Sequence, residues 1–283
     1  MNISPVVKWV GGKKRLVPYI KKYGPKKYTN YFEPFIGGGS VVLSLKPNKG
    51  VYLNDYNHDL VNLYRYIKKD YKEFIKRLER LKKGYIRSKK KRLFFYKQRY
   101  NFNKSPRNKI NRAVLYLFIN KVSFNGIMSM NKDGILNSSW GGGGVKYPMP
   151  GIYVKNNIEQ FSKFLRKVKL TNMDYEKALK NAKKGDFVFM DPPYVPDDIT
   201  LCNVKYLKNK WTIKDFERTF KVFDDLSRRG CYVMFTNSWS ETITKRFSNK
   251  QKYRLIKIPV NRMVSRNKNT RGIKYEALIT NYK

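Results

Sequence analysis

This sequence is poor in features on which several classes of protein depend. Only two cysteines, Cys202 and Cys231, occur in 283 residues, too few for a disulfide framework or a cysteine-rich zinc site. His58 is the single histidine, which argues against catalytic triads and histidine-rich metal sites, so we expect no bound metal. No run of about 18 apolar residues and no apolar secretory segment is present. We therefore expect an intracellular protein that is neither secreted nor a membrane protein.

Acidic residues are also scarce. The chain has 20 Asp and Glu against 62 Lys and Arg, which gives a formal net charge of +42. A charge of this size favours a polyanionic partner, because lysine and arginine that neutralise phosphates release condensed counterions. With 41% hydrophobic and 15% aromatic residues, the chain can still bury a core, so it is not a disordered basic tail.

The basic charge is densest at residues 65–112. This stretch has 20 basic residues and three acidic ones, a net charge of +17 within 48 residues. Aromatic residues are interleaved with the charge, namely Phe94, Phe95, Tyr96, Tyr100 and Phe102. Such a mixture is more typical of a packed basic surface than of a tail, and it indicates a region that contacts nucleic acid.

Hydrophobic periodicity predicts alternating strands and helices on both sides of this basic region. Residues 31–55 have the pattern of a strand, a glycine turn, a short helix and a second strand. Residues 60–81 have the spacing of an amphipathic helix, which we expect to end at Gly84. A helical run at 113–120 is followed by turn signals. Further strands are predicted at 168–171, 187–190, 232–235 and 254–260, with a helix at 213–226. The sequence thus predicts an α/β domain formed by residues 1–56 and 158–283, interrupted by a basic insertion at 57–157.

The first motif with chemical meaning follows the strand at 31–35. Gly37, Gly38 and Gly39 come directly after that strand, and Asp55 stands 18 positions after Gly37 at the end of the next strand. Glycines allow a ligand to approach the backbone closely, and an acid about 20 residues further on can accept hydrogen bonds from ribose hydroxyls. The pair indicates a site for an adenosine-containing ligand, although the spacing differs from that of dinucleotide-binding proteins.

The second motif is Asp191-Pro192-Pro193-Tyr194, directly after the apolar strand at 187–190. The Asp191 carboxylate and the Pro192 carbonyl can both accept hydrogen bonds from the exocyclic amine of a heteroaromatic base. Positive charge that develops on the amine nitrogen is then stabilised by these oxygens. Tyr194, which we expect to be exposed, can stack on the base, at a gain of roughly 1–3 kcal/mol.

The third motif is Lys8-Trp9-Val10-Gly11-Gly12-Lys13 near the N-terminus. A tryptophan and a lysine beside a Gly-Gly turn could contact a carboxylate and an aromatic or sulfonium group. The phosphate-binding pattern G-x-x-x-x-G-K-[ST] is absent from this stretch.

Taken in order, the three motifs resemble those of the Dam-type, or alpha-group, DNA adenine-N6 methyltransferases. The resemblance is carried by Lys8-Trp9-x-Gly11-Gly12-Lys13, Phe32-Glu33-Pro34-Phe35-x-Gly37-Gly38-Gly39, Asn54-Asp55 and Asp191-Pro192-Pro193-Tyr194. It extends to Ser238 and to the ending, from Arg271-Gly272 to Thr280-Asn281-Tyr282.

The resemblance implies a Rossmann-like methyltransferase domain, with a mainly helical target-recognition domain that carries a β-hairpin inserted at 57–157. It implies S-adenosyl-L-methionine as the methyl donor. By position, the donor-binding residues are Trp9, Lys13, Glu33, Phe35, Gly37, Asp55, Asp174 and Asp191. The resemblance assigns the methyl-transfer chemistry to Asp191, Pro192, Pro193 and Tyr194. These residues act on an adenine that has been flipped out of the double helix.

The same resemblance assigns DNA contacts to the insertion. Phosphate contacts are expected from Arg87, Lys90, Arg92 and Arg99, and base contacts from Asn125, Ser129 and Asn131. Methyltransferases that read GATC carry an arginine three positions after the glycine of the Asn-Gly pair, where this chain has Ser129, so a different target is expected. The implied partners are double-stranded DNA and a separate restriction endonuclease, with the chain itself a monomer.

Other functions stay open from the residues alone. Transfer to cytosine N4 or to an RNA base would use the same acceptor geometry, and a non-catalytic nucleic-acid-binding protein could keep the fold. Carbon-5 cytosine transfer needs a reactive thiolate. Cys231 opens an apolar strand instead, and we expect it to be a small buried hydrophobic residue.

Overall fold

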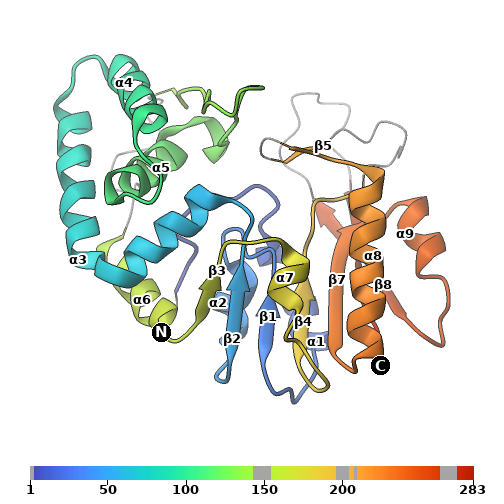
Figure 1. The fold of residues 1–283 in the computed structure, drawn as a ribbon. Helices are drawn as coiled ribbons and strands as arrows, with labels where there is room; N and C mark the ends of the chain where they lie inside the picture. The colour runs from blue at the N-terminus through green and yellow to red at the C-terminus, as the bar shows by residue number, and fades with distance from the viewer. Residues whose placement is uncertain (1–2, 143–153, 196–203, 207–208, 262–272) are drawn as a thin grey trace. The chain divides into compact units, whose positions relative to one another are not determined.

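The protein is described by a computed structural model that covers residues 3–142, 154–195, 204–206, 209–261 and 273–283 (Figure 1). Two features of the sequence, Cys202 and the Arg271-Gly272 pair, lie outside the described residues. The helices are α1 (Val17–Tyr23), α2 (Ser40–Leu45), α3 (His58–Arg87), α4 (Lys91–Lys104), α5 (Ile110–Val122), α6 (Lys155–Arg166), α7 (Tyr175–Leu179), α8 (Ile213–Arg228) and α9 (Glu241–Arg246). The strands are β1 (Tyr31–Glu33), β2 (Val51–Asn54), β3 (Lys169–Thr171), β4 (Phe187–Met190), β5 (Val204–Tyr206), β6 (Asn209–Trp211), β7 (Tyr232–Ser238), β8 (Arg254–Asn261) and β9 (Ile273–Thr280).

Seven of the strands form one sheet, in the order β3-β2-β1-β4-β7-β9-β8, and β5 pairs with β6 apart from it. The strand and helix predictions at 31–55, 168–171, 187–190, 213–226, 232–235 and 254–260 are confirmed with small shifts at their ends. The α/β fold class is therefore confirmed. The chain folds into two compact units. Unit 1 comprises Met1–Gly12, Ile36–Lys46 and Leu53–Asp174, and unit 2 comprises Lys13–Phe35, Pro47–Tyr52 and Tyr175–Lys283.

Unit 2 is centred on β4, whose four residues are all buried. β4 runs parallel to β1 and to β7, with Phe187 opposite Tyr232 and Met190 opposite Phe235. A strand that is covered on both faces needs apolar side chains at every position, which explains the unbroken run in the sequence. Helix α8 packs along β7 (Figure 1). The parallel arrangement brings the carboxyl ends of β1, β4 and β7 to one edge of the sheet.

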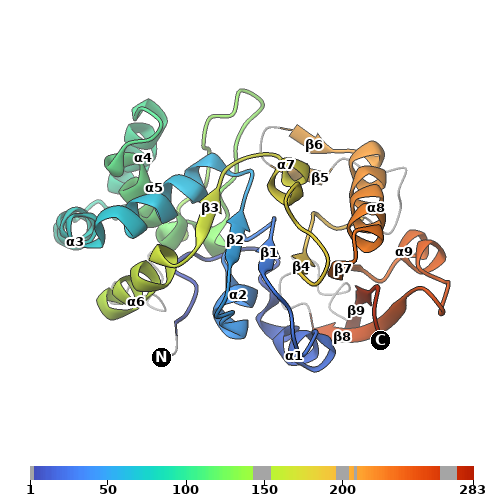
Figure 2. The ribbon, with the colours of Figure 1, turned by 60° about the horizontal axis from the view of Figure 1, so that its bottom comes forward.

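Unit 1 contains the long helix α3, which packs against α5 and α6, while α4 packs against α5 (Figure 2). Aromatic contacts fill these interfaces, such as Tyr64 edge-on to Phe161 at 5.1 Å and Tyr85 edge-on to Phe118 at 5.4 Å between ring centroids. The proposed inserted domain, residues 57–157, belongs wholly to this unit, and its limits stay a prediction.

Helix α3 differs from the prediction at two points. It continues through Gly84 to Arg87, so the expected end at Gly84 was wrong. The ring of Phe94 lies against Gly84, and a Cβ added there would be 3.3 Å from the ring carbons. The glycine therefore makes room for helix packing and does not end the helix. The helix is interrupted at Asp70, whose φ of −151° and ψ of 81° are not helical. The side chain of Asp70 accepts a hydrogen bond from the backbone of Glu73 and so begins a new helical segment.

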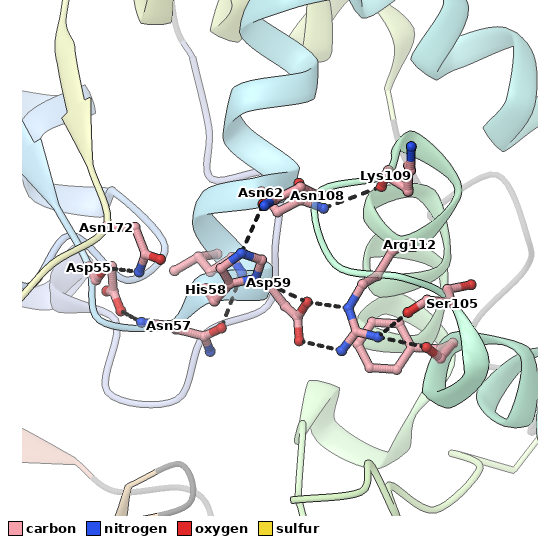
Figure 3. Close-up of polar contacts among 12 residues, drawn as sticks. Asp55, Asn57, His58, Asp59, Asn62, Ser105, Asn108, Lys109, Arg112 and Asn172 are labelled. Atoms are coloured by element: carbon pink, nitrogen blue, oxygen red, sulfur yellow. Dashed lines mark hydrogen bonds and ion pairs between the residues drawn. The ribbon is translucent and has the colours of Figure 1, made fainter.

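A buried ion pair joins the start of α3 to α5 (Figure 3). The Arg112 guanidinium donates to both oxygens of Asp59, at 2.6 and 3.0 Å, and to the carbonyl oxygens of Phe102 and Ser105 at the end of α4. Its guanidinium carbon also lies 4.1 Å from the centroid of the Phe102 ring. One side chain thus fixes three helices of unit 1 at a single point.

Within the described ranges, no helix combines the length and apolar character that crossing a lipid bilayer requires. Cys231 is buried, as expected, and burial raises the pKa of its thiol to about 11. His58 is the first residue of α3, where its Nε2 contacts the Asn108 side chain at 2.9 Å.

Candidate active site

The Asp191-Pro192-Pro193-Tyr194 segment leaves the carboxyl end of β4. Asp191 holds two polar partners: the Lys13 ammonium at 2.9 Å from Oδ2, and the Thr236 hydroxyl at 2.7 Å from Oδ1. Burial raises the pKa of the Asp191 carboxyl, while the hydrogen bonds from Lys13 and Thr236 oppose the rise. Asp191 is therefore fixed in orientation and surrounded by donors, which is the environment of a carboxylate that accepts hydrogen bonds.

Tyr194 is held from two sides in unit 2. Its hydroxyl donates to Oε2 of Glu276 at 2.7 Å, and the Lys13 ammonium lies 4.6 Å from the centroid of its ring. The expectation of an exposed aromatic was wrong, because the ring is only partly accessible and carries the ammonium on its face. Lys13 thus contacts both Tyr194 and Asp191.

The backbone after Tyr194 is fixed by β7. Val195 donates its backbone N–H to Oδ1 of the buried Asn237 at 2.8 Å, and its carbonyl oxygen accepts from the Ser238 hydroxyl. These hydrogen bonds span more than 40 residues of sequence. The sequence pattern singled out Ser238 only through family resemblance, and it missed Thr236, Asn237 and Glu276. No local spacing signals them, since each acts on the site across the sheet.

Glu33 is the last residue of β1, and Phe35 comes two positions later, at the same edge of the sheet as Asp191. Glu33 is buried, and its Oε2 accepts the hydroxyl of Tyr31 at 2.7 Å. The Phe35 ring packs against Tyr175 and Trp211, with centroid distances of 5.0 and 6.4 Å. Phe35 thus provides an apolar wall beside the acidic end of β1.

In unit 1, the glycine turn and Asp55 are bonded to each other. Gly37 donates its N–H to Oδ2 of Asp55 at 2.9 Å, and Asn57 donates to Oδ1 at 2.8 Å. The Tyr64 hydroxyl donates to the Gly37 carbonyl at 2.7 Å. Burial raises the pKa of Asp55 to about 6, although the backbone N–H groups stabilise its charge. Gly37 and Asp55, which the sequence grouped into one motif, are therefore in direct hydrogen-bond contact.

Trp9 lies directly on this turn. Gly37 has a φ of +47°, and a Cβ placed there would overlap the indole Nε1 of Trp9. A Cβ at Gly38 would lie 3.0 Å from the Trp9 Cβ. Glycine is therefore needed at position 37 for both its backbone angle and its contact with the indole.

The side chain of Asn172 bonds the backbone at Asp55 (Figure 3). Its Nδ2 donates to the carbonyl oxygens of Asp55 and Tyr56, at 2.8 and 3.1 Å. Asp174, the predicted donor-binding acid, is partly buried and lies directly before α7. The segment that carries Asp174 is thus attached to the end of β2 through the side chain of Asn172.

The basic residues assigned to DNA contacts fall into two groups. Arg87, Lys90 and Arg92 are exposed around the α3–α4 connection. Arg99 instead donates to the Ser138 carbonyl at 2.8 Å and lies 4.7 Å from the Tyr96 ring, so it attaches the 123–142 segment to α4. A hollow of about 670 Å³ beside these side chains is lined by Lys89, Lys90, Lys91, Arg92, Leu93, Tyr96 and Trp140.

The predicted β-hairpin is not formed as paired strands. Within residues 123–142, antiparallel pairing is limited to two isolated bridges, Ser123 with Trp140 and Met130 with Leu136. Backbone hydrogen bonds such as Asn137 N–H to the Ser129 carbonyl join the two arms without a regular ladder, and Asn103 bonds both the N–H and the carbonyl of Leu136. We call residues 123–131 the recognition loop.

The three predicted base-reading residues of the recognition loop differ in accessibility. Asn125 is exposed with a φ of +52°, and Ser129 is exposed. The Asn131 side chain instead bonds Asp133 and the N–H of Ile135, so it supports the turn that follows the loop.

Comparison with known proteins decides the family. Residues 9–263 match the model of the D12 class N6 adenine-specific DNA methyltransferases. The chain belongs to this family. As a D12 class enzyme, it methylates the N6 amine of adenine in DNA, which sets aside the cytosine, RNA and non-catalytic alternatives. S-adenosyl-L-methionine is the standard methyl donor of the D12 class.

Individual relatives match over almost the full chain. The Type II methyltransferase M1.LlaDCHI of Lactococcus lactis subsp. cremoris is 32% identical over 100% of this chain and 96% of its own. The Type II methyltransferase M.MjaIII of Methanocaldococcus jannaschii is 31% identical over 100% of both chains. The DNA adenine methylase of Escherichia coli K12 is 28% identical over 98% of this chain and 94% of its own.

Proposed function

We propose that this chain transfers the methyl group of S-adenosyl-L-methionine to a flipped-out adenine through Asp191, Pro192, Pro193 and Tyr194. The observation that supports it most is the Asp191 carboxylate at the end of β4, already bonded to an ammonium and a hydroxyl. An ammonium nitrogen at 2.9 Å occupies the kind of position that an exocyclic amine would take. When bound, the donor supplies an electrophilic methyl group on a sulfonium that leaves as a neutral thioether.

The residues of unit 2 then act on the amine. Asp191 and the Pro192 carbonyl accept its two N–H groups, which directs the nitrogen lone pair out of the ring plane. As the nitrogen gains the methyl group and becomes positive, the Asp191 carboxylate stabilises the charge and takes up the proton. Tyr194 stacks on the base.

Donor binding is assigned to Trp9, Gly37, Asp55 and Asp174 in unit 1, and to Lys13, Glu33, Phe35 and Asp191 in unit 2. The fit to S-adenosyl-L-methionine rests on the chemistry of these groups. A buried carboxylate that already accepts backbone N–H groups suits ribose hydroxyls, and the bare Gly37 backbone lets a ligand approach closely.

Replacing Asp55 by alanine should weaken binding of S-adenosylhomocysteine by roughly 10- to 100-fold, because hydrogen bonds to an ionised acceptor are lost. Isothermal titration calorimetry measures the affinity, with Glu217→Ala as a control at an exposed acid of α8. In the wild type, affinity should also fall as the pH drops through about 6, where Asp55 becomes protonated, and Asp55→Ala should lose this dependence. Equal affinities of the wild type and Asp55→Ala would remove Asp55 from the site.

DNA binding should depend steeply on salt. If Arg87, Lys90 and Arg92 each neutralise a phosphate, the slope of log K against log salt should be about −3 or steeper. Arg92→Ala should reduce the magnitude of that slope by about 1, whereas Lys250→Ala, outside the basic region, should not change it. Fluorescence anisotropy of a labelled duplex measures both, and a flat plot for the wild type would contradict the phosphate contacts.

We further propose that the target differs from GATC, since Ser129 cannot make the bidentate guanine contact of an arginine. Two relatives are Type II methyltransferases by name, which supports a separate restriction endonuclease with the same target, and we propose that the chain acts as a monomer. Modification-sensitive sequencing of DNA from cells that express the chain tests the target. Methylation confined to GATC would overturn this specificity.

A further inference from the structure

The N-terminal motif and the recognition loop meet at one buried side chain of unit 1. Asn120, near the end of α5, is completely buried. Its Oδ1 accepts the backbone N–H of Lys8 at 2.8 Å, and its Nδ2 donates to the Lys8 carbonyl at 2.8 Å. The Asn120 amide thus bonds both the backbone N–H and the backbone carbonyl of Lys8, as a neighbouring β-strand would.

The second N–H of the Asn120 amide goes to the recognition loop. Nδ2 also donates to the carbonyl oxygen of Gly126, at 3.0 Å. Both donors and the acceptor of the amide are therefore used, so any movement of Lys8 or Gly126 leaves a buried polar group without its partner, a costly state.

Gly126 also touches Lys8 directly. It has a φ of +72°, and a Cβ placed there would overlap the Cβ of Lys8. The Lys8 ammonium in turn donates to the carbonyl of Lys121, at 3.1 Å. The backbone and the side chain of Lys8 are thus both attached to the segment that leads into the recognition loop.

Trp9 follows Lys8 in sequence, and its indole lies on Gly37 and Gly38 of the glycine turn. Adjacent residues share a rigid peptide plane, so Lys8 cannot shift without moving Trp9. Close packing then passes a small displacement on to the glycine turn, because such contacts leave no space to absorb it.

We propose that Asn120 and Lys8 couple occupancy of the donor site to the conformation of the recognition loop. Asn120 is a positioning residue in this scheme, since it acts through Lys8 and Gly126. The inference rests on the proposed function, in which Trp9 binds the donor and residues 123–131 contact DNA. Because coupling between two sites is reciprocal, DNA should alter donor affinity by the same factor as the donor alters DNA affinity.

Gly126→Ala tests the coupling with a matched control. Gly142 has nearly the same φ, +70°, but a Cβ there meets no atom of the described residues within 4 Å, so Gly142→Ala introduces similar backbone strain without the contact. In the absence of DNA, Gly126→Ala should weaken S-adenosylhomocysteine binding by about 5- to 50-fold. Gly142→Ala should stay within about twofold of the wild type. Equal affinities of the two variants would overturn the inference.

A second measurement does not depend on the folding of a variant. The affinity of the wild type for S-adenosylhomocysteine is measured with and without a saturating duplex that carries the target adenine. We expect a difference of at least about fivefold, reduced towards unity in Asn120→Asp, which keeps the shape but lacks both N–H donors. No difference in the wild type would also overturn the inference.

Trp9→Ala separates this inference from the proposed function. If Trp9→Ala leaves S-adenosylhomocysteine affinity unchanged, the donor role of Trp9 fails. If Trp9→Ala weakens binding but Gly126→Ala does not, the donor role stands and the coupling through Lys8 fails.

Discussion

Replacing Asp191 by alanine should lower the rate of methyl transfer to DNA by at least about 10³-fold. Removal of one preorganised group that stabilises transition-state charge typically costs 10²- to 10³-fold, and Asp191 would also take up the proton. Single-turnover transfer of a labelled methyl group to duplex DNA measures the rate. DNA affinity should change little, because the phosphate contacts are assigned to Arg87, Lys90 and Arg92.

Two further variants sharpen this result. Asp191→Asn preserves the shape but not the charge, so it should be nearly as slow as Asp191→Ala. Asp215→Asn changes an acid that forms the capping box at the start of α8, and it should keep the wild-type rate. In the wild type, the rate should decline as the pH falls through the raised pKa of Asp191. Only the ionised carboxylate can take up the proton and stabilise the positive charge on the amine nitrogen. Full activity of Asp191→Ala would refute the mechanism.

The second large effect concerns stability. Arg112→Ala should lower the free energy of unfolding by about 3–5 kcal/mol, because it leaves Asp59 as an unpaired charge with 8% of its side chain exposed. The carbonyl oxygens of Phe102 and Ser105 lose their donor as well. Chemical denaturation followed by circular dichroism measures the change.

An exposed ion pair in the same unit provides the control. Lys163 and Glu159 pair one helical turn apart on α6, with 55% and 32% of their side chains exposed, and Lys163→Ala should leave stability nearly unchanged. The double variant Asp59→Asn with Arg112→Met removes both charges and should recover part of the loss. If Arg112→Ala were as stable as Lys163→Ala, the buried pair would have no structural role.

Local patterns predicted much of the fold. The strand at 187–190 was predicted at its observed limits, because four consecutive apolar residues before an acid and two prolines allow few alternatives. Gly84 misled the prediction for α3, since a glycine that makes room for the Phe94 ring looks the same in sequence as one that ends a helix. After Asn125 the two arms are joined by two isolated bridges and scattered backbone hydrogen bonds instead of regular strands, and the turn signals in the sequence do not distinguish these cases.

The sequence singled out site residues where they lie shortly after a strand. Asp55 directly follows β2 and Gly37 comes four residues after the end of β1, and the two form a hydrogen bond. Glu276 holds Tyr194 from 82 residues away, and nothing in the sequence links the two positions. The role of Asn120 was equally hidden, since in sequence it is one polar residue near the end of an apolar helix, and only its three backbone partners distinguish it.

Gly37 also determines how this segment tolerates mutation. Two separate features restrict which amino acid can occupy this position. The backbone φ is left-handed, and the indole of Trp9 occupies the place of a Cβ. Among the residues that the structure describes, none lies within 4 Å of a Cβ at Gly142, so Gly142 carries only the first restriction. In a saturation screen, position 142 should therefore accept asparagine or aspartate, which tolerate that angle, whereas position 37 should accept no other amino acid.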